Sequence, residues 1–181
     1  MKELSLNILD VAKNSVVAGA ENVMISLVTD ADGMLTLIIK DDGCGMTEET
    51  VKNVTDPFYT TRTTRKVGMG LPLLKLAAEQ TGGYLKLESS KAENDHGTTV
   101  TAVFDTKSID FMPIGDIVST ICILIAGSPE IDFDFSDITQ DRQISLQTKE
   151  LRAVLGEDIS LAEPEIQAWM SEYLSEQYAQ H

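Results

Sequence analysis

The sequence predicts an α+β fold: a two-layer sandwich in which helices cover one face of a mixed, mostly antiparallel sheet. Two observations predict it. Over residues 1–105 the periodic segments follow the order helix, two strands, helix, loop, helix, two strands. In the first strand pair the sequence Asp32-Gly33 marks a tight hairpin, which makes the two strands antiparallel.

Each element of this first region has a local signal. Gly19 ends an amphipathic helix, Thr47 begins a short helix with an acidic first turn, and Gly82 ends a third helix. The strands are rich in β-branched and other apolar residues. The expected elements are helices over 4–18, 47–54 and 71–81, and strands over 23–29, 35–40, 84–89 and 98–104.

Composition predicts a second region from residue 106. Residues 1–105 carry 15 acids and 10 bases, a net charge of −5, whereas residues 106–181 carry 14 acids and 4 bases, a net charge of −10. We expect a domain of residues 1–105 and a small acidic α+β domain of residues 106–181 whose role is unknown. The elements expected in the second domain are a helix over 114–126, a hairpin over 131–146, and helices over 148–155 and 164–177.

The overall composition excludes several classes of protein. A net charge of −15 over 181 residues disfavours nucleic acid and anionic membrane as partners, because both repel an acidic surface. Cys44 and Cys122 lack the spacing of a disulfide framework or a zinc site. No signal-peptide core begins the chain, and the strongly apolar run 117–126 is too short to span a bilayer. We therefore expect a cytoplasmic protein.

The sequence Asp41-x-Gly43-x-Gly45 follows the apolar strand 35–40. A carboxylate at the end of a buried strand can accept a hydrogen bond from the exocyclic amine of adenine, whereas guanine would offer it an oxygen. The two glycines allow a flat ring to approach the backbone closely. The same sequence also occurs as an ordinary turn, so the rest of the chain decides between the two readings.

The chain contains four further motifs besides this one. The five motifs and their order resemble the Bergerat-fold superfamily of ATPases, which includes histidine kinases, gyrase, Hsp90 and MutL. The resemblance covers residues 1–105. The segment 14–20 is most similar to the MutL and gyrase branch, and the segment 56–62 to the kinase branch. The motifs are Asp10-x-x-x-Asn14, Asp41-x-Gly43-x-Gly45, Asp56-Pro57-Phe58-Tyr59-Thr60-Thr61-Arg62, Gly68-Met69-Gly70-Leu71 and Gly97-Thr98.

The resemblance implies Mg-ATP as the ligand. Asn14 would offer a neutral side-chain oxygen to Mg²⁺, which prefers oxygen ligands completed by phosphates and waters. Asp10 is the candidate catalytic residue, one helical turn earlier on the same face. It stands where hydrolysing members carry a glutamate that polarises water. The shorter aspartate leaves open whether it activates water or bonds to a water of the magnesium shell.

Residues 58–70 would form the ATP lid. Hydroxyls and cations concentrate there in a chain otherwise short of bases, as a triphosphate requires, although a flexible surface loop has a similar composition. The candidate phosphate-binding residues are Thr60, Thr61, Arg62, Arg65, Lys66, Gly68, Gly70 and Leu71. Gly68 and Gly70 would expose N–H groups at a helix N-terminus. Lys66 replaces the first glycine of the usual pattern, which either weakens one phosphate turn or adds a cation. Thr98 would reach a water beside adenine, or be a plain strand threonine.

The use of the nucleotide is less well determined than its binding. His96 lies in a polar turn and His181 ends the sequence, so neither has the helical context of a phosphoacceptor, and a kinase would need an acceptor in trans. We expect a regulatory protein kinase, of serine or histidine type, or an ATP-gated switch acting on a partner protein. The alternatives are a weak ATPase that dimerises on nucleotide binding, as MutL and gyrase do, and a non-catalytic ATP-binding module.

Overall fold

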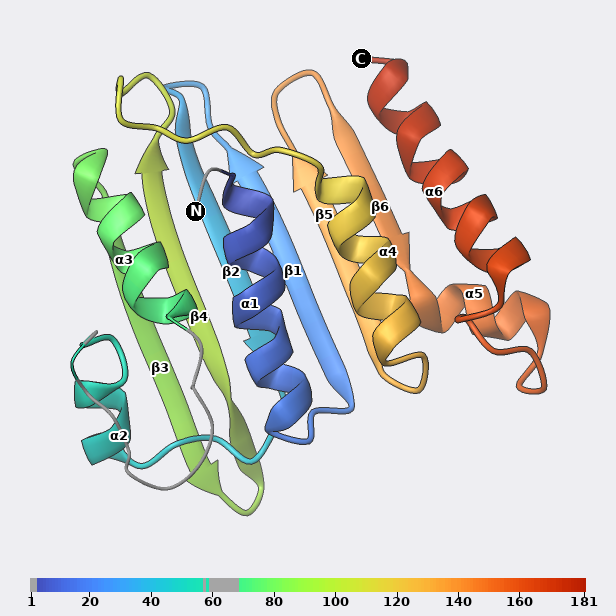
Figure 1. Ribbon diagram of the computed structural model, residues 1–181, viewed down its shortest axis with the longest axis horizontal. Helices are drawn as coiled ribbons and strands as arrows, with labels where there is room; N and C mark the ends of the chain where they lie inside the picture. The colour runs from blue at the N-terminus through green and yellow to red at the C-terminus, as the bar shows by residue number, and fades with distance from the viewer. Residues whose placement is uncertain (1–2, 57, 59–68) are drawn as a thin grey trace.

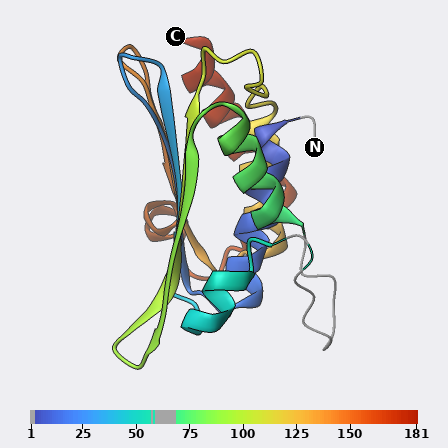
Figure 2. The same ribbon diagram turned by 90° about the vertical axis from the view of Figure 1, so that its left-hand side faces the viewer.

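The computed structural model has two layers, a single six-stranded sheet and a set of helices of which most pack on one of its faces (Figure 1, Figure 2). It describes residues 3–56, 58 and 69–181. The strand order is β3-β4-β2-β1-β5-β6. Neighbouring strands are antiparallel except β1 and β5, which are parallel. The predicted α+β sandwich with a mixed, mostly antiparallel sheet is therefore confirmed.

The elements within the described residues are as follows. The helices are α1 (Leu4–Val17), α2 (Glu48–Asn53), α3 (Gly70–Gln80), α4 (Ile117–Gly127), α5 (Thr148–Leu155) and α6 (Pro164–Ala179). The strands are β1 (Asn22–Thr29), β2 (Met34–Asp41), β3 (Tyr84–Ala92), β4 (Asp95–Asp105), β5 (Asp132–Ile138) and β6 (Gln143–Gln147). All the elements expected from the sequence are present.

The end of β3, the start of β4 and the start of α4 each differ by three residues from the expected position. The β3–β4 ladder continues to the pair Ala92 and Asp95, so the expected turn over 91–97 is mostly strand. Backbone pairing needs no apolar side chain, which is why this exposed polar hairpin lacks a sequence signal. Helix α4 begins at Ile117 and not at residue 114, because the Asp116 carboxylate caps it by accepting hydrogen bonds from the Ser119 N–H (2.9 Å) and hydroxyl (2.6 Å).

The sheet buries one face against the helices. In β2, Leu35, Leu37 and Ile39 are at most 1% exposed, whereas the residues between them are partly or fully exposed. This alternation places every second side chain in the core and leaves the other sheet face open. Figure 2 shows α1, α3 and the C-terminal helix α6 on the same side of the sheet.

The second region extends the sheet of the first. Strand β5 pairs in parallel with β1, from Asn22 opposite Asp132 to Val28 opposite Ile138, and β6 then forms the edge. Helix α4 packs on α1 and α6 packs on α4, so both regions contribute to one hydrophobic core. The boundary at residues 105 and 106 stays a prediction about domains, since the two parts share a sheet.

A buried polar cluster fixes α6 to this added part of the sheet. The Asp137 carboxylate, 2% exposed, accepts hydrogen bonds from the Arg142 guanidinium (2.9 Å) and the Tyr178 hydroxyl (2.7 Å). The same guanidinium lies over the Tyr178 ring, 5.0 Å from its centroid. Burial and the nearby Asp137 carboxylate raise the pKa of Tyr178, so its hydroxyl stays a donor.

Across the described residues, none of the helices has both the length and the apolar character needed to cross a bilayer.

Candidate functional site

The C-terminal half of α1 carries the first part of the site. Asp10 and Asn14 are one turn apart and partly exposed, and neither makes a side-chain hydrogen bond to another described residue. Ser15, the next residue, is 3% exposed and faces the sheet. Helix α1 thus presents two oxygen-bearing side chains on one face while directing a hydroxyl towards the end of β2.

Asp41, the last residue of β2, has both carboxylate oxygens held in place. Its Oδ2 accepts a 2.6 Å hydrogen bond from the Ser15 hydroxyl, and its Oδ1 accepts a 2.9 Å hydrogen bond from the Gly43 N–H. The residue is 9% exposed. A carboxylate offers about four acceptor positions, so this one is fixed in orientation and still able to accept from a ligand amine.

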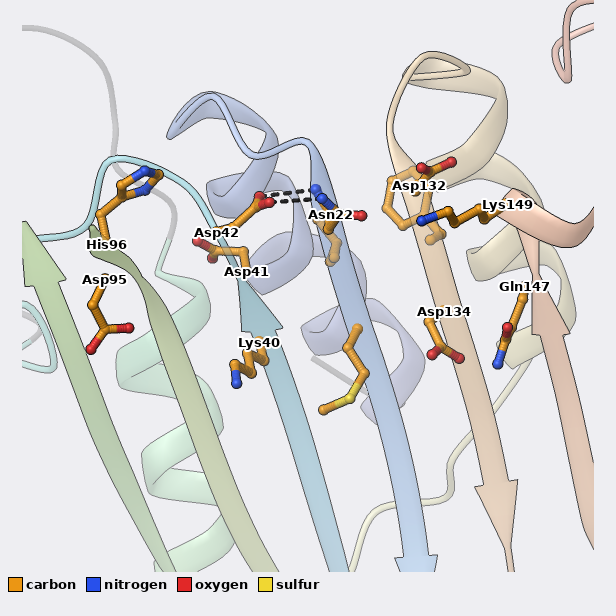
Figure 3. Close-up of a pocket in the computed structure, with 13 residues that line it drawn as sticks. Asn22, Lys40, Asp41, Asp42, Asp95, His96, Asp132, Asp134, Gln147 and Lys149 are labelled. Atoms are coloured by element: carbon orange, nitrogen blue, oxygen red, sulfur yellow. Dashed lines mark hydrogen bonds between the residues drawn. The ribbon is translucent and has the colours of Figure 1, made fainter. Parts of the chain in front are cut away.

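The next residue, Asp42, has a carboxylate that binds the backbone at the start of β1. It accepts hydrogen bonds from the backbone N–H groups of Glu21 (2.8 Å) and Asn22 (2.9 Å) and from the Asn22 amide (2.8 Å), as Figure 3 shows for Asn22. Partial burial opposes ionisation, but these hydrogen bonds together hold the pKa of Asp42 below its usual value. Asp42 thus ties the end of β2 to the start of β1.

The two glycines of the loop are required by close packing. A Cβ on Gly43 would lie 2.8 Å from the Ala18 Cβ, so this residue lets the loop pass against the end of α1. Gly45 has a φ of 72°, in the left-handed region. A Cβ there would overlap the carbonyl oxygen of Ser90 in β3. The loop is therefore confined between α1 and the β3–β4 hairpin.

The β3–β4 hairpin supports the same loop with polar contacts. The Nδ1 of His96 lies 2.7 Å from the Gly43 carbonyl oxygen. Ser89 accepts from the Met46 N–H at 2.8 Å, and its hydroxyl lies 2.8 Å from that of Thr98, which stands opposite Asp41 in the β2–β4 register. Thr98 thus lies beside the loop, and its contact with a water near adenine stays a prediction.

The start of α3 approaches α1. A Cβ added to Gly70 would lie 3.1 Å from the Cβ of Asp10, so these two predicted site residues are neighbours. Leu71 is buried at 5% exposure, which makes it a packing residue of the α3 N-terminus. Met69 precedes the helix without a side-chain capping hydrogen bond. Among the described residues, no side chain accepts a hydrogen bond from the first N–H groups of α3.

The structure therefore brings together eight of the fourteen residues predicted for the site, around the C-terminal half of α1, the end of β2 and the start of α3. These are Asp10, Asn14, Asp41, Gly43, Gly45, Gly70, Leu71 and Thr98. The remaining six lie outside the described residues: Thr60, Thr61, Arg62, Arg65, Lys66 and Gly68.

Sequence reasoning missed the contributions of Ser15 and His96. Ser15 was placed with the apolar face of α1, and its signal was a hydroxyl on an otherwise apolar buried row. The sequence places His96 in a polar turn, and the β3–β4 pairing brings it to Gly43.

A pocket of about 430 Å³ opens on the face of the sheet away from α1 (Figure 3), and its lining includes Asp41, Asp42 and His96. Its lining carries both signs of charge, with Lys40 and Lys149 beside several carboxylates, among them Asp132 and Asp134. The Asp41 carboxylate, by contrast, bonds to Ser15 on the helix side of the sheet. The pocket and the candidate site therefore meet at the end of β2.

This fold and this arrangement of Asp10, Asn14, Asp41 and the glycine loop define an ATPase-type module. Residues 1–108 match the family model described as Histidine kinase-, DNA gyrase B-, and HSP90-like ATPase. The chain belongs to this family, and its first region is an ATP-binding, kinase-like ATPase module.

Two of the curated relatives are sporulation kinases. The chain is 30% identical over 109 residues to sporulation kinase C of Bacillus subtilis, covering 60% of this chain and 24% of that protein. It is 33% identical over 96 residues to sporulation kinase E of the same organism, covering 51% of this chain and 12% of that protein. The chain thus spans a quarter or less of the length of these relatives.

Among solved structures, the ADP complex of the Aquifex aeolicus MutL ATPase domain is similar over 86% of this chain and 69% of that one. The TM-score is 0.55 and the sequence identity 16%. At this identity the similarity shows a shared fold. It reaches well beyond residue 108, so the sheet extension by residues 106–181 lies largely within the part that superposes.

Proposed function

We propose that this chain binds Mg-ATP between α1, the loop 41–45 and the N-terminus of α3, and uses it as a regulatory protein kinase or ATP-gated switch on a partner protein. The observation that carries the proposal is the Asp41 carboxylate. Ser15 and Gly43 fix it in orientation at the end of a buried strand, with acceptor positions to spare.

Asp41 accounts for the choice of base. A carboxylate fixed in this way accepts a hydrogen bond from the exocyclic amine of adenine and would face an oxygen of guanine. A site rejects a ligand strongly when binding that ligand would leave one of the site's polar groups without a hydrogen-bond partner. Gly43 and Gly45 keep the neighbouring backbone free of side chains, which suits a flat ring.

The partly exposed oxygens of Asp10 and Asn14 fit a magnesium ion whose other ligands are phosphates and waters. The uncapped N–H groups at the start of α3, beside Asp10, fit a phosphate. We propose that Asn14 binds the metal and that the cations of residues 58–68 bind the triphosphate. The bound Mg-ATP would supply the phosphoryl group.

The kinase reading needs a phosphoacceptor in trans. His96 bonds through its Nδ1 to the Gly43 carbonyl oxygen and so has a role within the loop. The similarity to sporulation kinases supports the reading for the ATP-binding part. A specific observation favours the second candidate, a weak ATPase: Asp10 stands next to Gly70 at the phosphate end of the site. There it could position a water.

Calorimetry tests the site directly. ATP, ADP and GTP are titrated with and without Mg²⁺ into the wild-type chain and Asp41→Asn. We expect ATP and ADP to bind, GTP to be ignored and Asp41→Asn to bind at least about 100-fold more weakly, because the buried acceptor is replaced. Equal binding of GTP, or of ATP by the variant, would overturn the assignment.

A second assay separates the two uses. Transfer from γ-labelled ATP to protein in a lysate, lost in Asn14→Ala, supports the kinase. Phosphate release that rises with protein concentration and is lost in Asp10→Asn supports the ATPase. If the chain binds ATP but neither labels a protein nor releases phosphate, the result supports the ATP-gated switch.

A further inference from the structure

A groove of about 760 Å³ lies between α5 and α6, beside the edge strand β6. In Figure 1 these two helices diverge at the end of the molecule opposite α2 and α3. No residue assigned to nucleotide binding lines the groove. Its apolar lining consists of Leu146, Leu151, Val154, Leu155, Ile166, Trp169 and Tyr173.

Several of these apolar side chains are exposed to solvent. Val154 is 84% exposed and Trp169 is 45% exposed. The Trp169 ring stacks on that of Tyr173, with centroids 5.0 Å apart and planes 12° apart, which presents one rigid aromatic surface. Ile166, Trp169 and Tyr173 follow the spacing of one helix face. Such a concentration of apolar surface is typical of a contact site.

The charges around the groove select a basic occupant. Glu150 and Glu165 line it, and among the described residues no lysine or arginine does. Arg152 of α5 is engaged elsewhere, since its guanidinium donates to Asp132 Oδ1 (3.1 Å) and the Ile131 carbonyl (2.7 Å). An occupant with positive charges would complement these carboxylates, and an acidic one would be repelled.

The edge strand β6 is poorly suited to pair with an added strand of a partner protein. The Gln177 side chain accepts from the Ser145 N–H (3.1 Å) and donates to the Ser145 carbonyl (3.2 Å), so the middle of β6 already has its outer hydrogen bonds. A partner strand would have to displace this amide. A groove between two helices, lined by apolar side chains, instead fits an amphipathic helix.

We propose that this groove binds an amphipathic helix of a partner protein. The apolar face of that helix would lie between α5 and α6, with lysine or arginine side chains next to Glu150 and Glu165. This inference goes beyond the proposed function and does not depend on nucleotide binding. It gives residues 106–181 a role, namely partner recognition.

The chain contains a single tryptophan, Trp169, so its fluorescence reports on the groove directly. The full chain is titrated with a synthetic helical peptide of leucine and lysine, and separately with one of leucine and glutamate in the same apolar pattern. The lysine peptide is expected to shift the Trp169 emission to shorter wavelength and to saturate at one peptide per chain. The glutamate peptide is expected to leave the emission unchanged.

Two substitutions locate the binding. Val154→Glu places a charge on the apolar wall, and Glu165→Lys reverses a rim charge; each is expected to weaken binding about 10-fold. Ile109→Glu and Asp110→Lys are the matched controls, both on the exposed connection before α4, and should bind as the wild type does. All four changes are at exposed positions, and equal melting temperatures will show that the fold is retained.

Three results would overturn the proposal. The first is unchanged binding in both Val154→Glu and Glu165→Lys. The second is a dimer in sedimentation experiments that Val154→Glu abolishes, which would make a second copy the occupant. The third is the same emission shift with vesicles of a zwitterionic lipid and no peptide, which would make the groove a lipid contact.

Discussion

The Ser15 hydroxyl donates a 2.6 Å hydrogen bond to Asp41 Oδ2 and so joins α1 to the end of β2 at the centre of the candidate site. Because the donor and the acceptor are both buried, this bond fixes the direction in which the carboxylate presents its remaining acceptor positions. The proposed site thus depends on a residue that acts only through another side chain.

Ser15→Ala is expected to lower ATP affinity about 5- to 10-fold, the size of one lost hydrogen bond, as measured by calorimetry. Ser5→Ala is the matched control: Ser5 is equally buried on α1, but its hydroxyl lies near Glu3. If Ser15→Ala binds ATP like the wild type, then Asp41 does not depend on this bond.

Gly45→Ala should destabilise the fold. The left-handed φ of 72° alone costs about 1–3 kcal/mol for a residue with a Cβ. The overlap with the Ser90 carbonyl adds to that cost. Gly127→Ala, at the end of α4 with no neighbour within 4 Å, should be neutral or more stable by about 1 kcal/mol at most. Urea unfolding compares the two, and equal effects would contradict the close approach.

The lowered pKa of Asp42 predicts that the folded state loses stability at acidic pH. Its pKa is held below the ordinary 3.8, so it stabilises the fold above that pH and loses this contribution as the pH falls through the folded-state value. Asp42→Asn should therefore melt below the wild type at pH 7, and the difference should shrink at acidic pH below 3.8. Asp95→Asn, an exposed neighbour, should show no such trend. A difference that is constant with pH would refute the role.

His96→Ala should weaken ATP binding by about 2- to 10-fold, because the hydrogen bond to the Gly43 carbonyl is lost. His181→Ala, which removes the other histidine of the chain, serves as the control and should bind ATP normally. Calorimetry at pH 7.5 compares the two variants. An equal affinity in His96→Ala would show that the loop keeps its shape without the hairpin contact.

Tyr178→Phe should cost about 1 kcal/mol of stability by removing the hydroxyl that donates to Asp137. The raised pKa of Tyr178 means that this contribution is complete below the ordinary value of 10.0 and is lost as the pH rises beyond it. Tyr173→Phe, on the same helix, is the control. Chemical unfolding at pH 7 and above pH 10.0 measures both variants.

Much of this protein follows from local sequence. Asp32-Gly33 determined the first hairpin, Thr47 the start of α2, and the alternation of Phe133 and Phe135 the strand β5, because turns, caps and buried strands depend on neighbouring residues. The sequence also singled out Asp41 and its glycines, since a carboxylate followed by two glycines after an apolar strand is a local pattern.

Contacts between distant segments needed the tertiary structure. The sequence contained no signal that Ser15 would bond to Asp41 or that His96 would reach Gly43. Strand β5 pairs with β1 across more than a hundred residues, and no local pattern indicated that pairing. Local patterns determine which residues form strands, helices and turns. The pairing of strands and the partners of buried polar groups depend on how the whole chain packs.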